Sequence, residues 1–587
     1  MSPEPRLSSI PGFRKPTGSF RLVALAAALG CLTGVAVAGI QSFVVLAQRA
    51  TLGFAAERRI VLPDHASHLR IALALTCSAI LVTVLSRLLS RWKTREPLDA
   101  VEANALSGGT MSWFDAVGVV IPILASVSFG ASVGIEAAVT QLGAVLASRL
   151  GRRLGRPRSD LRVLVGAGSA AAIAAAYRAP IAGMLYAYEL VLGTYSKRTL
   201  APIGLAAICA VITMWLLTGQ AKPFDLPLET RAFWSDFPLA LVIGLLAALL
   251  GIGVMLLVTI LERLFKRLFP NHAVRRAAAG LLLTILSIRF PAVLGSGHAA
   301  VEHAVNGDIA GRHALELLGA KTVASAASLG SGFRGGLFSA SLLMGALLGQ
   351  GIAWIAPLIP GIPPVSPGLC AVIGMASVGA SIIGSPLTMI FLVLETTGDY
   401  DAAIVVAIGA VAASFLTDRL FGYSFATWRF QQRGLAIEGG HDVSRLAASP
   451  ITGIIRPPKR SVAANADLDD VLRAVSTAGA RGTAVYRHDG SFAGLIDPRL
   501  VEAIEEEEGR LPIVAADLIY ETSPAVTPKT NLAELVEIFR NDDRATIAVM
   551  DPADNRTLVG VVRARDAFAL ASNILDMQRR EDLGISK

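Results

Sequence analysis

One acidic side chain, Glu136, stands alone in a long apolar run. The segment from Ala116 to Leu146 reads AVGVVIPILASVSFGASVGIEAAVTQLGAVL, and Glu136 is its only ionisable residue. A charged group at membrane depth is costly unless it is paired, hydrated or protonated, so such a residue predicts a functional site. Gly134 permits a tight turn, and the small residues that follow predict a helix that starts at Glu136. Because the N–H groups of a helix start attract anions, Glu136 would compete with an anion for one site.

The composition is that of a polytopic membrane protein. Of the 587 residues 53% are hydrophobic and 17% charged, and the mean hydropathy of +0.57 is too high for a soluble globular protein of this size. The net charge of +8 comes from Lys and Arg clusters between apolar spans and in the tail. These charges orient loops at a lipid bilayer and do not predict a nucleic-acid partner.

Neither metal nor catalytic chemistry is predicted. The four cysteines are widely separated, and each lies in or beside an apolar span: Cys31, Cys77, Cys209 and Cys370. Their spacing predicts neither a disulfide nor a metal site. No nucleophile with a neighbouring base and no metal-ligand cluster is visible, so we expect neither an enzyme nor a bound cofactor.

The apolar segments predict membrane helices of unequal length between residues 20 and 435. Residues 1–19 are basic and predict a cytoplasmic N-terminal segment, followed by helices at about 20–48 and 68–90. Further apolar segments follow up to residue 418, many of them roughly 12 to 18 residues long. Because a helix needs about 20 residues to span a bilayer, these segments predict tilted or partial helices whose ends meet inside the protein.

An internal repeat organises these helices. Gly134-Ile135-Glu136 aligns with Gly336-Leu337-Phe338, and Gly168–Glu189 aligns without gaps to Gly374–Glu395. A third pair, Ala100-Val101-Glu102 with Ala300-Val301-Glu302, keeps the same order. The matches predict a duplicated domain with halves at about 68–218 and 272–432, and a binding site at the repeat interface near the membrane midplane. Glu136 and Phe338 would face each other there.

The C-terminal part has the charge density of a soluble domain. After a linker at 436–448, two units at 449–510 and 511–575 each show a helix, a strand, a turn, a strand beginning at Gly494 or Gly560, and a closing helix. Residues 576–587 are a tail. This part is predicted to be a cytoplasmic tandem α/β module.

Together these residues resemble the CLC family of chloride channels and proton-coupled chloride transporters, with a C-terminal pair of CBS domains. The resemblance covers nearly the whole chain after Phe20, and its most specific stretch is Ala371–Tyr400. It implies an all-α polytopic membrane domain built as an inverted repeat, followed by an α/β tandem CBS module. It also implies a homodimer in a bacterial inner membrane, in which each subunit carries chloride or another small inorganic anion through its own pathway.

The resemblance also implies roles for single residues. The family motif GREGP corresponds to Gly134–Ala138, with Glu136 as the gating glutamate, and GxFxP corresponds to Gly336–Ala340, which keeps Phe338 but loses the proline. The family's inner tyrosine corresponds to Tyr423. The implied anion-binding residues are Gly134, Ile135, Gly336, Leu337, Phe338 and Tyr423. Burial disfavours the charged carboxylate, so our hypothesis is that protonation of Glu136 opens the pathway.

Two departures from the family pattern bear on coupling and selectivity. The family segment GSGIP, whose serine binds the central anion, falls near Arg95–Asp99, where neither serine nor glycine remains. The second glutamate of proton exchangers corresponds to Leu190, although Glu189 beside it remains a candidate for a proton pathway. We therefore predict a chloride channel gated by Glu136, with a proton-coupled antiporter as the alternative. A CBS-regulated cation transporter is a second alternative, but it would want several midplane carboxylates. Nitrate and fluoride stay open as substrates.

The nucleotide signature of the C-terminal module is degraded. The CBS element Gly-x-x-Ser/Thr-x-x-Asp corresponds to Gly560–Asp566, where Arg563 replaces the hydroxyl and Asp566 is a candidate ribose ligand. In the first unit Gly494 is followed by Asp497 and Leu500, so the acid is absent. We therefore expect a dimerisation module in preference to an adenine-nucleotide sensor.

Overall fold

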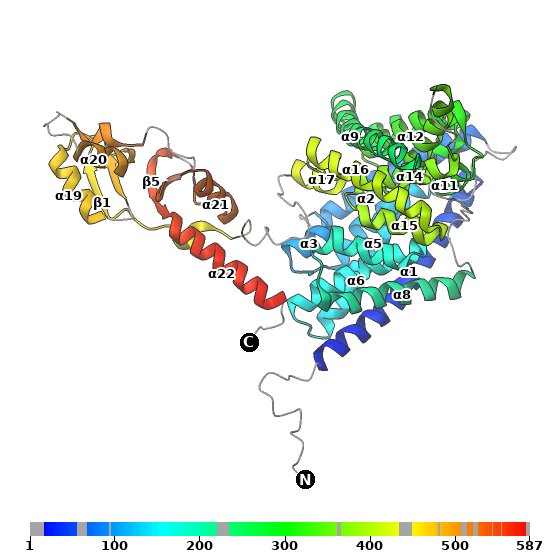
Figure 1. Cartoon of the computed structure of the whole chain (residues 1–587), viewed down its shortest axis with the longest axis horizontal. Coiled ribbons are helices and arrows are strands. Elements are labelled where there is room, and N and C mark those ends of the chain that lie inside the picture. Colours follow the sequence, from blue (N-terminus) through cyan, green and yellow to red (C-terminus); the bar gives the residue numbers. More distant parts are fainter. Residues whose placement is uncertain are drawn as a thin grey trace, which may run out of the picture. The chain divides into compact units, whose positions relative to one another are not determined.

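The structure, a computed structural model, divides into two compact units, Met1–His441 and Asp442–Lys587 (Figure 1). It describes residues 17–55, 67–92, 96–219, 234–360, 365–433, 446 and 449–582, without 479–481, 506–512, 521–525, 543 and 553. Most of the predicted N-terminal segment 1–19 and of the predicted linker 436–448 lies outside the described residues.

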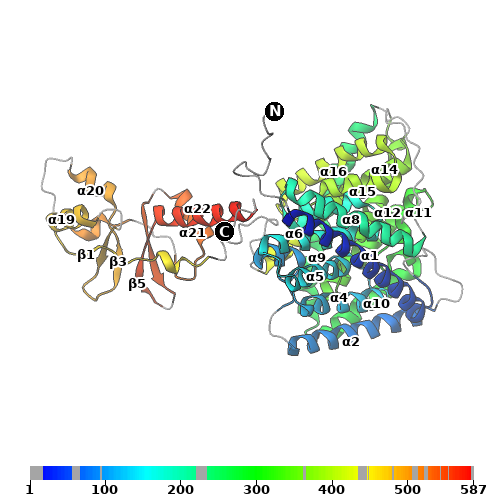
Figure 2. The ribbon, with the colours of Figure 1, turned by 90° about the horizontal axis from the view of Figure 1, so that it is seen from below.

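The first unit is built of helices (Figure 1 and Figure 2). The first eight are α1 (Thr17–Leu52), α2 (His68–Trp92), α3 (Ala100–Leu106), α4 (Trp113–Val127), α5 (Glu136–Arg153), α6 (Arg158–Tyr177), α7 (Pro180–Tyr186), which continues as the π-helical turn η2 (Ala187–Leu192), and α8 (Lys197–Thr218). The others are α9 (Asp236–Leu268), α10 (His272–Arg289), α11 (His298–Val305), α12 (Gly311–Ser331), α13 (Phe338–Ile355), α14 (Pro367–Ile383), α15 (Pro386–Thr397), α16 (Tyr400–Leu420) and α17 (Phe425–Gln432), with 3₁₀ turns η3 (Pro291–Val293) and η4 (Ala356–Leu358).

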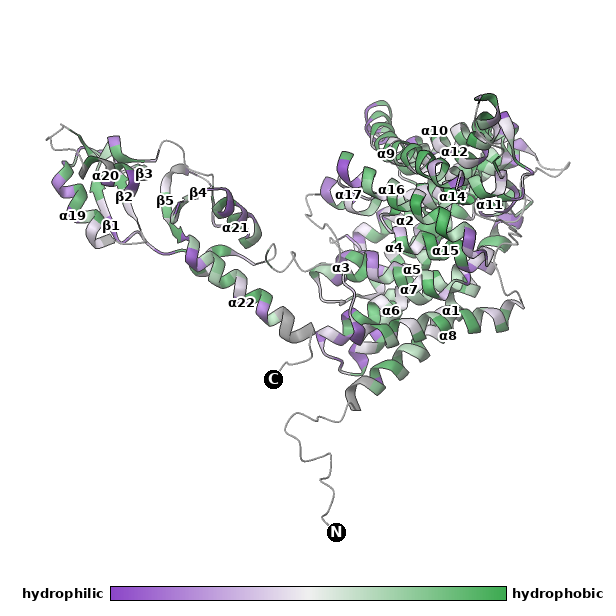
Figure 3. Ribbon diagram, in the orientation of Figure 1, coloured by the Kyte–Doolittle hydropathy of each residue, from purple (hydrophilic) through white to green (hydrophobic). Residues whose placement is uncertain are grey.

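The prediction of an all-helical membrane domain is confirmed. Among the described residues seven helical spans are long and apolar enough to cross a membrane, and hydrophobic residues cover most of this unit in Figure 3. Shorter apolar helices, such as α7 and α15, complete the domain. Sequence reasoning missed α3 and α11 as helices, because segments of 7 and 8 residues carry no long apolar run.

The aligned glycines mark equivalent helix crossings. Helices α5 and α6 meet at Gly143 and Gly168, and α13 and α14 meet at Gly345 and Gly374. At each of these four positions an added Cβ would collide with the backbone carbonyl of the partner glycine. Only glycine permits such close backbone approach, so the two halves pack in the same way.

The equivalence extends beyond the predicted halves. Helix α1 packs on α6 and α8, and α9 packs on the corresponding α14 and α16. Each half therefore includes one further long helix N-terminal to the range predicted for it. The predicted ranges 68–218 and 272–432 began too late because the short motifs that revealed the repeat all lie C-terminal to these helices.

The described residues of the second unit form two small sheets. Strands β1 (Arg460–Ala463), β2 (Thr483–Tyr486) and β3 (Phe492–Leu495) form one, with β1 parallel and β3 antiparallel to β2, and β4 (Thr546–Asp551) pairs antiparallel with β5 (Asp554–Arg563). The helices are α19 (Leu468–Ala478), α20 (Pro498–Glu505), α21 (Leu532–Asn541) and α22 (Ala564–Asp582).

The order helix, strand, turn, strand, helix occurs twice in this unit, as the sequence predicts. The predicted starts of two strands are wrong, since β3 begins at Phe492 and β5 at Asp554, before the glycines. Strand β5 begins early because Asp551 at the end of β4 already pairs with Asp554.

Each half of this unit contributes a short flanking segment to the hydrophobic core of the other half. Ile451 packs with Leu532 and Leu535 in the core of the second half, whereas Ala515 and Leu518 pack with Val471 and other residues of the first. The predicted border at residues 510 and 511 therefore does not separate the two cores. Short turns at 451–454 and 515–518 each cross to the other half, which the local sequence pattern does not indicate.

Candidate functional site

The site lies where the loops before α5 and α13 meet. Gly134 N–H donates to the carbonyl of Gly336 at 2.9 Å, and Gly336 N–H donates to the carbonyl of Gly134 at 3.1 Å. A reciprocal antiparallel pair of this kind has a local twofold axis, as an inverted repeat requires. Ile135 and Leu337 follow as the N-caps of α5 and α13, so two helix N-termini start beside one another at the repeat interface.

Glu136 is held by hydroxyl groups from both halves of the repeat. Its side chain is only 5% exposed, and its Oε1 accepts a hydrogen bond from the Tyr177 hydroxyl at 2.9 Å and another from the Ser339 hydroxyl. The two hydroxyl oxygens lie 3.0 Å apart. Tyr177 ends α6 and Ser339 lies in the first turn of α13. The carboxylate thus occupies a point on which donors from two repeats converge.

The room that Glu136 uses depends on glycine. A Cβ at Gly134 would collide with Oε2 of Glu136, because the carboxylate folds back over the loop that precedes its own helix. The missing side chain at this position therefore permits the bent conformation that places Oε1 beside the two hydroxyls. The sequence predicted a tight turn at Gly134, and the structure shows that the missing side chain also makes room for the carboxylate.

Phe338 lies between two tyrosines. Its ring centroid is 5.1 Å from that of Tyr177 and 6.2 Å from that of Tyr186, and Tyr177 is also 5.6 Å from the ring of His298. Phe338 therefore packs against Tyr177, whose hydroxyl donates a hydrogen bond to the Glu136 carboxylate. The structure brings six of the predicted site residues together: Gly134, Ile135, Glu136, Gly336, Leu337 and Phe338.

Sequence reasoning missed Tyr177 and Ser339. Tyr177 is fully buried at the end of α6, where Arg178 takes a left-handed conformation with φ of 52° and Pro180 opens α7. A buried phenol needs a hydrogen-bond partner, so a tyrosine at this break was a signal for a nearby polar group. Ser339 follows Phe338 directly, and its hydroxyl was the other available signal.

Tyr423 has a different environment. Its ring contacts are with Phe421 at 6.1 Å and Trp428 at 5.6 Å, which belong to its own segment at the start of α17. Among the residues that the structure describes, no ring contact or hydrogen bond joins Tyr423 to Glu136 or Phe338. Its role as an anion ligand therefore stays a prediction that rests on the resemblance.

Glu189 caps a helix of the other half. Its carboxylate accepts hydrogen bonds from the N–H groups of Leu387 and Thr388, both at 2.9 Å, and from the Thr388 hydroxyl at 2.6 Å. Glu395 does the same for the first turn of α7, where it accepts two backbone N–H bonds at 2.8 and 2.9 Å. These reciprocal contacts give Glu189 and Glu395 equivalent positions, and they explain both residues as N-terminal caps of short helices.

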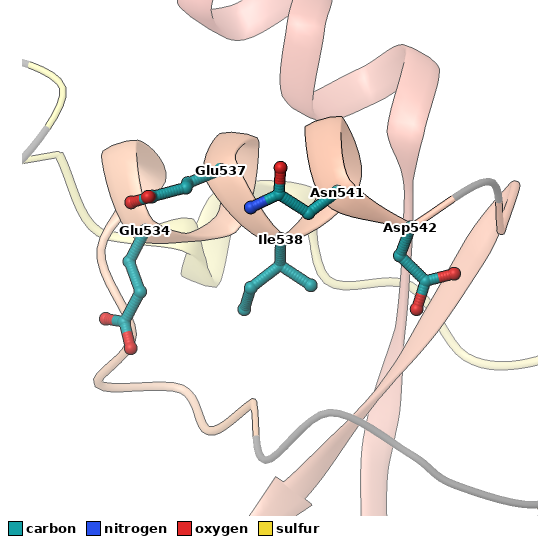
Figure 4. Close-up of a pocket in the computed structure, with 5 residues that line it drawn as sticks. All are labelled: Glu534, Glu537, Ile538, Asn541 and Asp542. Carbon is teal, nitrogen blue, oxygen red and sulfur yellow. The ribbon is translucent and has the colours of Figure 1, made fainter.

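In the second unit Asp566, in the first turn of α22, is paired with Arg563 at the end of β5 and with Arg565 of its own helix. Arg563 donates to it at 2.7 Å, and Arg565 lies 3.7 Å from its other oxygen. A shallow pocket of about 420 Å³ on α21 is acidic (Figure 4), with three carboxylates among its lining residues Glu534, Glu537, Ile538, Asn541 and Asp542. Like charges at a pocket repel nucleotide phosphates, so its lining does not suit an adenine nucleotide.

Comparisons with known proteins agree on the membrane unit. The family model described as voltage gated chloride channel matches residues 77–418. A putative chloride channel protein ClcB-like of Ralstonia nicotianae is 34% identical over 312 residues, 52% of this chain and 72% of the relative. The voltage-gated ClC-type chloride channel ClcB of Salmonella dublin is 28% identical over 418 residues, 68% of this chain and 97% of the relative.

Three solved structures share the fold. A slow cyanobacterial Cl⁻/H⁺ antiporter is 20% identical with a TM-score of 0.60, and the match covers 70% of this chain and 98% of the antiporter chain. A CLC-type fluoride/proton antiporter is 25% identical with a TM-score of 0.57 and the same coverage. A eukaryotic CLC transporter is 17% identical with a TM-score of 0.61, over 94% of this chain and 99% of its own.

Proposed function

Because the chain belongs to the voltage-gated chloride channel family, we propose that it carries chloride or a similar small inorganic anion across a membrane along a pathway that passes Glu136. The choice of this site rests on one observation: a Glu136 carboxylate oxygen lies where the hydroxyls of Tyr177 and Ser339 converge. Donors without a fixed positive charge suit an anion that must bind and leave again.

The gate works by competition. As a carboxylate, Glu136 occupies the hydroxyl donors and closes the pathway. Once protonated it loses its charge and becomes a weaker acceptor, so its hydrogen bonds to Tyr177 and Ser339 weaken. The side chain then leaves, and an anion takes its place beside the same hydroxyls and the N-termini of α5 and α13.

An uncoupled channel is the favoured form of this function, and proton-coupled antiport is the alternative. Leu190 stands where exchangers of the family have a second glutamate, and three hydrogen bonds commit Glu189 to capping α15. These features support passive conduction. Family membership and the lone acid Glu136 in its apolar run speak against a cation transporter.

We propose further that the protein is a homodimer of a bacterial inner membrane with a cytoplasmic tandem CBS module. Its relatives ClcB and ClcB-like are bacterial proteins. The similarity to the eukaryotic CLC transporter covers 94% of this chain and so extends into the second unit. The twofold order of helices and strands in that unit also supports a tandem module.

Chloride efflux from liposomes tests the gate. Wild-type efflux is expected to rise as the pH falls, and Glu136→Gln, which cannot carry the negative charge, is expected to be open at every pH. Glu316→Gln on α12 is the matched control, since this carboxylate pairs with Arg289 and Arg312 away from the site. Unchanged pH dependence in Glu136→Gln would show that Glu136 is not the gate.

A further inference from the structure

The Glu136 carboxylate is almost closed off from its surroundings. Glu136 is buried, and so are the two side chains that donate hydrogen bonds to its Oε1, Tyr177 and Ser339. A gate that opens on protonation takes its proton up from solvent. The buried cluster therefore needs a partly exposed group beside it that carries protons.

His298 meets both conditions. Its ring packs on the ring of Tyr177, with 5.6 Å between the centroids and 40° between the planes. Phe338 also packs on Tyr177, but its ring has no exchangeable proton. His298 is only half-buried, so part of its surface stays accessible. Imidazole gains and loses a proton between about pH 5 and 8, which suits it to carry protons at ordinary pH.

A tight turn fixes the position of His298. Gly297 takes a left-handed conformation with φ of 87°, and the His298 N–H donates to the Ser296 hydroxyl at 3.3 Å. An added Cβ on Gly297 would lie 2.6 Å from the side chain of Leu343 on α13. The turn is thus packed closely against the helix that also carries Phe338, so the imidazole is held at the site and does not swing freely.

A buried lysine lies beside the same turn. The ammonium of Lys321 on α12 donates to the carbonyls of Gly295 at 2.9 Å and Val293 at 3.3 Å. It would lie 3.4 Å from a Cβ on Gly297, the residue before His298. A proton on His298 is therefore close to a positive charge, which favours its transfer onward to a negative carboxylate.

The helices packed on α11 add little further charge. Neither α13 nor α14 contains an acidic, basic or histidine side chain, and Cys370 of α14 is a buried thiol. On α11 itself Glu302 and His303 follow one turn after His298, and His303 pairs with Asp308 at 2.6 Å. The titratable group that joins His298 to the gate is thus the Tyr177 phenol.

We propose that His298 carries protons between solvent and Glu136; this rests on the proposed function, in which protonation of Glu136 opens the pathway. The imidazolium gives its proton to the Tyr177 oxygen while the phenol hydrogen passes to Oε1 of Glu136. The products are a neutral imidazole, an intact phenol and a neutral carboxylic acid. Hydrogen bonds for proton transfer are often long until the transfer occurs, so the ring contact is the starting geometry.

Stopped-flow chloride efflux from liposomes tests the proposal, because it separates the rate of opening from the equilibrium of the gate. The pH is lowered in one step in weak buffer, and the lag before efflux reports the opening rate. His298→Phe keeps a ring against Tyr177 and removes the titrating group. Its opening rate should fall by about a hundredfold, while the pH of half-maximal flux stays unchanged, since a proton carrier changes the rate alone.

Two further variants separate a proton carrier from a packing residue. His298→Ala leaves a space at the ring position, and added imidazole should restore its opening rate. This rescue also keeps the test valid if the phenylalanine variant folds poorly. His303→Gln is the matched control on the same helix, since His303 pairs with Asp308, and it should open at the wild-type rate.

Three outcomes overturn the inference. If His298→Phe and His298→Ala open at the wild-type rate, His298 does not carry the proton, while the Glu136 gate stands. If the pH of half-maximal flux moves and imidazole restores nothing, His298 only packs on Tyr177. If the wild type carries no chloride, or Glu136→Gln keeps the wild-type pH dependence, the proposed function fails and this inference with it.

Discussion

Removal of the Tyr177 hydroxyl should open the gate at higher pH. Tyr177→Phe keeps the ring against Phe338 and deletes the donor that lies 2.9 Å from Oε1 of Glu136. That hydrogen bond stabilises the charged, closed carboxylate. Its loss therefore favours the protonated, open gate, and the pH of half-maximal chloride flux moves in the alkaline direction.

The size of the shift follows from the geometry. A hydrogen bond to a charged group is worth about 1.5–3 kcal/mol, which corresponds to about 1 to 2 pH units. Ser339 still donates to the same oxygen, so the lower end of the range applies. We expect a shift of about 1 pH unit, equal to roughly a tenfold change in the ratio of closed to open gates.

The assay is chloride efflux from liposomes at stepped pH and low chloride. Low chloride matters because an anion bound at the same hydroxyl would offset the change. Tyr188→Phe is the control, because it removes a hydroxyl that bonds Thr199 at 3.0 Å and not Glu136, and it should leave the midpoint in place. Tyr177→Phe should add no pH effect in a Glu136→Gln background. If the midpoint of Tyr177→Phe is unchanged or moves to lower pH, this hydroxyl does not hold the gate closed.

Three further predictions concern stability and regulation. Gly345→Ala should destabilise the protein in detergent by about 1–3 kcal/mol, because its Cβ meets a backbone carbonyl. The control Gly253→Ala on α9 places its Cβ in open space and should be neutral or stabilising. Equal thermal midpoints of the two variants would contradict the close crossing of α13 and α14. Glu189→Gln and Glu395→Gln should each lower the free energy of unfolding by about 1–3 kcal/mol, and so lower the thermal midpoint by similar amounts, since the two carboxylates cap equivalent helices. A fall in only one of the two variants would contradict that equivalence. Millimolar adenine nucleotide should leave the thermal midpoint of the full chain unchanged, and a clear rise would show nucleotide binding despite the acidic pocket.

Much of the membrane unit could be predicted because its constraints are local. Apolar runs must become helices in a bilayer, and the aligned glycines indicated from the sequence that the domain is duplicated. Gly143 with Gly168 and Gly345 with Gly374 indeed make the same contact in both halves. The same alignment brought the Glu136 and Phe338 loops together before any contact was known.

The partners of Glu136 could not be found by that route. In the repeat alignment Tyr177 corresponds to Ile383 and Ser339 to Ala137, so neither hydroxyl has a counterpart that marks it. Their contacts join residues 41 and 203 positions apart from Glu136, which no local pattern encodes. The crossed cores of the second unit escaped prediction for the same reason, because Ile451 and Ala515 pack far from their sequence neighbours.

The most direct test of the account is the reversal potential of the purified protein in liposomes under a potassium chloride gradient, with and without an opposing pH gradient. An anion channel gated by Glu136 predicts the Nernst potential of chloride in both conditions. A potential that follows potassium would contradict the anion pathway itself, and a chloride potential that shifts with the pH gradient would replace the channel with a proton-coupled antiporter.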